Sequence, residues 1–154
     1  MRQTVSVSLI LALFISSAPG QQEQRTVLLP SRKVKAVSDR YSRDRSEKYD
    51  GNWVPAKADL DGLEKSLPQV SKMKILGWPL RIHIEHPEQY FQQYVAVLVA
   101  GKKMIFVNAF RDVQEFPQWR DRLVLVDDGD LGFWQALYDP ATNQFLNLRS
   151  NPRA

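Results

Sequence analysis

The chain has 154 residues, with 21 basic and 17 acidic side chains, four tryptophans, nine prolines and no cysteine. This length fits one small domain with additional segments. The lack of cysteine excludes a disulfide framework, a redox-active thiol pair, a cysteine nucleophile, a thiolate zinc site and a lipid-modified N-terminal cysteine.

Residues 1–20 have the pattern of a secretory signal peptide. Arg2 supplies a positive charge, an apolar stretch follows over 5–15, and small residues lead to Gly20. We expect cleavage after Gly20 and a secreted or periplasmic mature chain beginning at Gln21. The alternative is a retained anchor helix, but this stretch falls well short of the about 20 residues that span a bilayer. We therefore expect no membrane span after cleavage.

Residues 21–52 are predicted to form a disordered basic linker. Residues 21–58 hold nine basic and five acidic side chains, and apolar residues are few between 30 and 51. Such a segment buries too little surface to offset its ordering entropy. Two alternatives remain. The apolar stretch 26–29 could pair as a stray strand, and the basic residues 32–35 could attract an anionic envelope polymer.

Residues 53–154 are predicted to form a single α+β domain that begins with a short helix. Leu60, Leu63, Leu67 and Val70 recur at helical spacing, so they would form one apolar stripe. Asp59 precedes this stripe and is the expected N-cap. Pro68 is expected to end the helix. The following residues, 75–84, fit either a strand or an extended connector.

The rest of the domain predicts an antiparallel meander of four or five strands. The clearest feature is a hairpin, with strands over 91–99 and 104–110 and a turn at 100–103 that contains Gly101. An apolar run follows at 123–126, and further strands are expected at 133–138 and 144–148. The expected fold class is one short N-terminal helix packed on this meander.

This arrangement resembles the cystatin-like and PepSY-like helix-on-sheet families. Residues 127–134 and 138–142 also resemble small exported bacterial domains of unknown function. Cystatins inhibit cysteine proteases with a Q-x-V-x-G hairpin, and residues 97–101 end in Gly101 at the expected tip. Val97 stands where the family has Gln, whereas Gln93 begins a similar stretch that lacks the Gly. The family's second-loop Pro-Trp pair becomes Pro117-Gln118-Trp119, in a different connection.

Two short segments carry candidate metal ligands. His83, Glu85 and His86 lie within four residues, although Pro87 favours an extended His86 and separates the side chains. Asp127, Asp128 and Asp130 surround Gly129 and suggest calcium, without the spacing of an EF-hand. The alternative for each is structural: solvent-exposed histidines beside a connector, and an acidic hairpin turn. We predict no cofactor.

The sequence lacks recognisable catalytic motifs and has a surplus of aromatic residues. Phe133 and Trp134 are adjacent, so they point to opposite faces of a strand and one of them could serve as a binding platform. The candidate contact residues of the sheet and hairpin are Phe133, Trp134, Tyr94, Gly101 and Trp119.

We therefore predict an exported, non-catalytic binding domain. Its expected partner is an envelope or extracellular protein or polymer. Nucleic acid is not expected, because residues 59–154 hold 11 basic and 12 acidic side chains. Two alternatives stay open. One is a metal-binding protein or hydrolase that uses His83, Glu85 and His86 or the turn at 127–130, and the other is a cystatin-like protease inhibitor.

Overall fold

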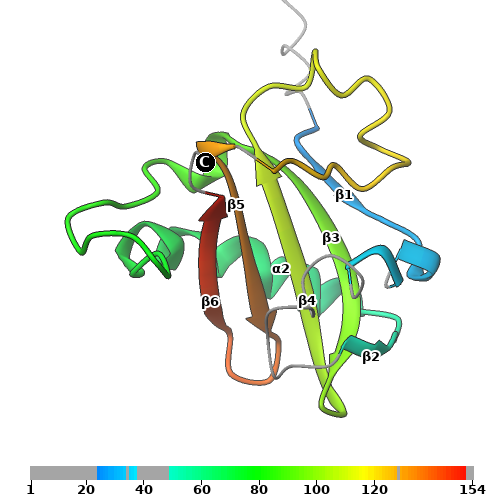
Figure 1. The fold of residues 1–154 in the computed structure, drawn as a ribbon. Coiled ribbons are helices and arrows are strands. Elements are labelled where there is room, and N and C mark those ends of the chain that lie inside the picture. Colours follow the sequence, from blue (N-terminus) through cyan, green and yellow to red (C-terminus); the bar gives the residue numbers. More distant parts are fainter. Residues whose placement is uncertain (1–23, 34, 38–48, 128, 152–154) are drawn as a thin grey trace, which may run out of the picture.

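The computed structural model describes residues 24–33, 35–37, 49–127 and 129–151 (Figure 1). The predicted signal peptide lies outside these residues. The described chain has an α+β fold built on one mixed sheet in the order β1-β3-β4-β5-β6, and β2 also pairs with β3. None of the helices in these residues is long and apolar enough to cross a membrane.

Four consecutive strands form the predicted antiparallel meander. They are β3 (Phe91–Val99), β4 (Lys102–Phe110), β5 (Asp130–Asp139) and β6 (Gln144–Asn151). The β3–β4 hairpin is closed by only two residues, Ala100 and Gly101, with φ values of 49° and 76°. Positive φ at both positions matches the twist of the flanking strands, so the turn is shorter than the predicted 100–103. The run at 123–126 is a loop and not a strand.

Two short strands flank β3 on its other side, and the parallel one of them makes the sheet mixed. β1 (Thr26–Leu28) runs parallel to β3, with Val27 opposite Gln93. β2 (Tyr49–Gly51) runs antiparallel to the far end of β3, with Tyr49 opposite Val99. The prediction of a purely antiparallel sheet was therefore wrong for β1, whereas β2 keeps the antiparallel direction.

The described parts of 21–52 pack against the sheet, and the rest of the predicted disordered linker lies outside the described residues. Leu29, Val37 and Tyr49 are buried and pack in one cluster with the face of β3 and β4 that carries Phe106. The Leu29 amide donates to the Tyr94 carbonyl at 2.8 Å. A few apolar side chains suffice because the strands offer them a preformed apolar face. This segment also contains a short 3₁₀ helix, η1 (Ser31–Lys33).

The predicted helix packs on the opposite face of the sheet. α2 spans Lys57–Ser66, and the 3₁₀ helix η2 continues over Leu67–Lys72. Leu63, Leu67 and Val70 are buried against side chains of β4 and β5, as their spacing predicted. The helix starts earlier than expected, so Asp59 is its third residue and not its N-cap. Its carboxylate accepts the Ala56 amide at 2.7 Å.

A row of buried amides holds the loop between β4 and β5 onto the face opposite α2. Gln93, Asn108 and Gln135 lie side by side on three neighbouring strands. The Asn108 Nδ2 donates to Gln93 Oε1 at 3.0 Å and to the Val124 carbonyl at 2.8 Å. The Gln93 Nε2 donates to the carbonyls of Trp119 and Arg122. Both faces of the sheet are therefore covered by this chain's own segments.

This amide row makes Asn108 a strong determinant of stability. We expect Asn108→Ala to lower the free energy of unfolding by about 3 kcal/mol, because it removes the partner of the buried Val124 carbonyl and of the buried Gln135 amide. Urea unfolding measures the loss. Gln118→Ala is the matched control, since this amide is exposed in the same loop, and it should change the free energy by less than about 0.5 kcal/mol. Equal effects of the two substitutions would contradict the role of the row.

Candidate functional site

The three predicted metal ligands of the 83–86 segment do not converge. His83 and Glu85 are exposed, and Ile84 between them is buried in the core. His86 has a left-handed backbone, with φ 50° and ψ 58°, immediately before Pro87. This conformation is uncommon for a residue with a side chain, and it turns the chain into η3 (Pro87–Gln89). The described residues contain no group of three acidic or histidine side chains arranged to hold a metal.

The structure describes two of the three predicted calcium ligands of the acidic turn. Asp130 begins β5 with a φ of 48°, and Asp127 belongs to the preceding loop. Asp128 lies outside the described residues. The pattern that suggested a ligand cluster therefore includes a strand residue.

Most predicted contact residues of the sheet are part of the interior. Trp134 is 0% exposed, and Tyr94 and Trp119 are each 3% exposed. Phe133 is partly buried on the face opposite Trp134, which agrees with the expected alternation. Gly101 alone of this set lies at an exposed hairpin tip. The sheet is therefore not an open aromatic platform, because α2 and the β4–β5 loop cover it.

The features of a cystatin wedge are not assembled. Gln93 is buried in the middle of β3, where its amide holds the β4–β5 loop. Trp119 stacks edge-on against Phe91 and Phe110, with ring centroids 5.5 and 5.9 Å apart. The hairpin tip at Gly101 precedes β4 and the loop that holds Trp119 follows it. The two segments therefore lie at opposite ends of the strand and cannot enter one cleft together.

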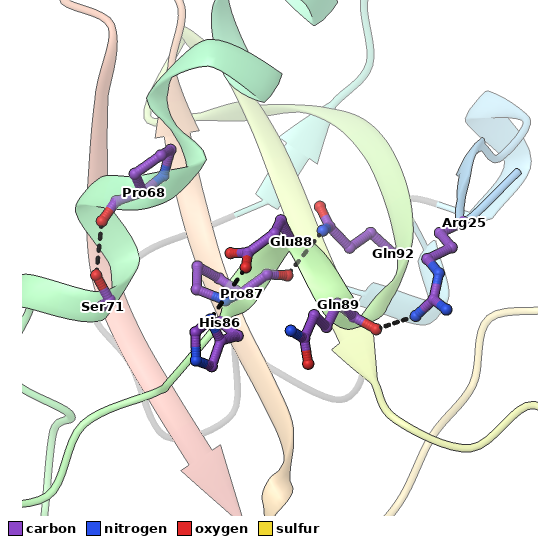
Figure 2. Close-up of polar contacts among 8 residues, drawn as sticks. All are labelled: Arg25, Pro68, Ser71, His86, Pro87, Glu88, Gln89 and Gln92. Atoms are coloured by element: carbon purple, nitrogen blue, oxygen red, sulfur yellow. Dashed lines mark hydrogen bonds and ion pairs between the residues drawn. The ribbon is translucent and has the colours of Figure 1, made fainter. Parts of the chain in front are cut away.

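Two open hollows instead flank η3. The larger, of about 450 Å³, lies between β1, α2, η3 and β3, and the smaller, of about 280 Å³, lies between η2 and η3. Glu88 lines both. Figure 2 shows the η3 residues between Pro68 and Ser71 on one side and Arg25 and Gln92 on the other. We call the larger one the η3 hollow; it is lined by Gln24, Arg25, Thr26, Glu64, Leu67, Glu88, Gln92 and Tyr94.

The floor of the η3 hollow is a hydrogen-bonded pair from β3. The Tyr94 hydroxyl donates to Gln92 Oε1 at 2.9 Å, and Gln92 Nε2 donates to the Pro87 carbonyl at 3.1 Å. Both side chains are buried. The pair thus fixes the position of η3 relative to the sheet. Tyr94 belongs to the site through this floor and not as an exposed aromatic.

The walls of the η3 hollow are charged. Glu64 of α2 and Glu88 of η3 supply exposed carboxylates, and Glu88 Oε1 lies 3.2 Å from His86 Nδ1. Arg25 is engaged elsewhere on the rim, since its guanidinium donates to the Gln89 carbonyl and lies over the Phe91 ring at 5.0 Å. The two carboxylates therefore face the hollow, whereas the Arg25 guanidinium bonds to a backbone carbonyl on the rim.

Buried tyrosines border this region, and their ionisation is suppressed. Burial raises the pKa of Tyr94 well above its ordinary value of 10.0, and the Glu64 carboxylate raises that pKa further. Burial also raises the pKa of Tyr90, while Arg111 opposes this shift and Glu85 adds to it. Tyr94 is therefore a neutral hydroxyl donor at physiological pH and not a general base.

The smaller hollow brings together a serine, a histidine and a glutamate, but it does not form a nucleophile–base pair. The Ser71 hydroxyl donates to the Pro68 carbonyl at 2.8 Å, whereas His86 Nδ1 contacts Glu88. Activation of a serine needs a direct hydrogen bond to its base. This geometry suits binding better than hydrolysis.

Sequence reasoning identified His86 and Tyr94 as site residues. It missed other polar residues around the hollows, which include Arg25, Glu64, Glu88 and Gln92. The adjacent glutamines at 92 and 93 were a usable signal, because two amides in an otherwise apolar strand must find buried partners. Glu64 carried no signal, since a glutamate on an amphipathic helix is usually only solvated.

No protein-family model matches the chain, and no curated protein or solved structure matches it. The resemblances to cystatin-like and PepSY-like folds therefore stay predictions from the sequence.

The buried tyrosines predict a loss of stability in alkali. Because the pKa of these tyrosines is higher in the folded than in the unfolded state, their neutral hydroxyls contribute fully to stability below pH 10. This contribution declines as the pH rises above 10. When the pH is raised from 8 to about 11, the free energy of unfolding should fall in both proteins. The fall should be about 1 kcal/mol smaller for Tyr94→Phe than for the unmodified chain. Urea unfolding at both pH values measures this. Each protein is compared with itself at the two pH values, which cancels the effect of losing the hydrogen bond to Gln92. An identical pH dependence of the two proteins would contradict the prediction.

Proposed function

We propose that this chain is an exported, non-catalytic binding module and that the η3 hollow is its ligand site. Export is supported by the signal-peptide pattern of residues 1–20. The observation that carries the site is an open hollow of about 450 Å³ built by segments far apart in the sequence. Pockets with a fixed floor and a few convergent polar groups are the usual form of ligand sites.

The walls of the η3 hollow favour a cationic group. Glu64 and Glu88 present carboxylates from two different elements, and the Gln92–Tyr94 floor is neutral and already hydrogen-bonded. A primary amine donates three hydrogen bonds, and the carboxylates of the walls are acceptors suited to it. The proposed ligand is therefore an amine-bearing side chain of an envelope or extracellular protein or polymer, such as a peptide with a free diamino acid.

A titration with a matched pair of peptides tests this function. The probes are a short capped peptide with one free lysine side chain and the same peptide with that lysine acetylated. NMR titration of the chain 21–154 should show shifts of residues around η3 with the free amine only. Binding of both peptides alike, no binding of either, or shifts that map elsewhere would overturn the proposal.

Substitutions of the carboxylates test the site itself. Glu64→Gln and Glu88→Gln should each weaken binding of the lysine peptide by about tenfold, because each removes one charge-assisted hydrogen bond. Glu115→Gln is the control, because this substitution removes the same charge from an exposed position in the β4–β5 loop. A uniform effect of the three substitutions would indicate only a loss of net negative charge.

A further inference from the structure

The connector between η2 and η3 projects past β6 (Figure 1). It carries two leucines that are exposed to solvent. Leu76 is 42% exposed and Leu80 is 71% exposed. Each is the second residue of a tight turn. One turn is closed by the Trp78 amide donating to the Ile75 carbonyl at 3.1 Å, and the next by Ile82 donating to Pro79 at 3.0 Å.

The connector is firmly attached, so these leucines are held outward. Ile75 and Ile84, at either side of the turns, are 1% and 0% exposed within the core. The Leu76 amide donates to the Leu148 carbonyl of β6 at 2.9 Å. Gly77 adopts a φ of 84°, which a residue with a side chain rarely takes. The two convex tips are therefore a fixed feature of the fold.

The stretch of sequence that carries the leucines contains basic and no acidic side chains. No aspartate or glutamate occurs between Glu64 and Glu85 in the sequence. Lys72 at the end of η2 and Lys74 and Arg81 on the connector are exposed. The partly buried Trp78 packs beneath the turns, against the main core. Exposed leucines within a basic segment are the combination by which peripheral proteins engage anionic bilayers.

We infer that the connector 72–83, here called the docking turns, binds the surface of a bilayer that contains anionic lipids. Leu76 and Leu80 enter the interface between headgroups and acyl chains, and the basic side chains remain with the phosphates. Convex tips suit a deformable lipid surface, since a protein partner would need a matching groove. This binding is peripheral and is independent of the amine ligand proposed for the η3 hollow.

Flotation with lipid vesicles tests the inference. The chain 21–154 is used because it keeps every described residue and omits the apolar stretch 5–15, which would bind lipid by itself. It should float with phosphatidylcholine vesicles that contain about 30% phosphatidylglycerol and not with phosphatidylcholine alone. Raising the salt from about 50 to about 500 mM should weaken this binding. Absence of flotation, or equal flotation with both vesicle types, would overturn it.

Matched substitutions locate the contact. Leu80→Glu should weaken vesicle binding by about tenfold or more, whereas Val54→Glu should leave it unchanged, because Val54 is 90% exposed away from the connector. Arg81→Glu should weaken binding more than Lys102→Glu, which changes net charge equally at the β3–β4 hairpin. Melting temperatures equal to that of the unmodified chain establish folding. Equal effects within either pair would show that the docking turns are not the contact.

Discussion

Two adjacent buried glutamines of β3 place the loops on both faces of this protein. Neighbouring residues of a strand point to opposite faces. Gln92 points toward α2 and donates to the Pro87 carbonyl, which positions η3. Gln93 points to the other face and donates to carbonyls of the β4–β5 loop. An unsatisfied buried amide costs about 1–3 kcal/mol, so each loop must stay where its carbonyl meets the strand.

Because both faces of the sheet are covered, the two proposed binding sites lie at its margins. α2 closes one face, and the β4–β5 loop and the segment around β1 close the other. The docking turns belong to the chain between α2 and β3, and the same stretch supplies the η3 wall of the hollow. Ile75 and Ile84 anchor that stretch in the core. If the docking turns rest on a bilayer, their rigid attachment sets the orientation of the hollow relative to the membrane.

The sequence predictions were more accurate for features set by residues close along the chain than for contacts between distant residues. The pattern of the hairpin correctly predicted β3 and β4, and the spacing of Leu63, Leu67 and Val70 identified the buried side of the helix. Within the candidate site, His86 and Tyr94 were named, but for metal binding and aromatic contact. Their observed partners, Glu88 and Gln92, satisfy local polar groups instead.

The sequence by itself determined the α+β class, the β3–β4 hairpin and the amphipathic helix. These depend on periodicity and turn chemistry, which act between residues close along the chain. Only the tertiary structure decided that β1 joins the sheet in parallel and that Arg25, Glu64 and Glu88 meet at one hollow. Such contacts depend on which distant apolar surfaces and amides satisfy one another, and no local pattern encodes that choice.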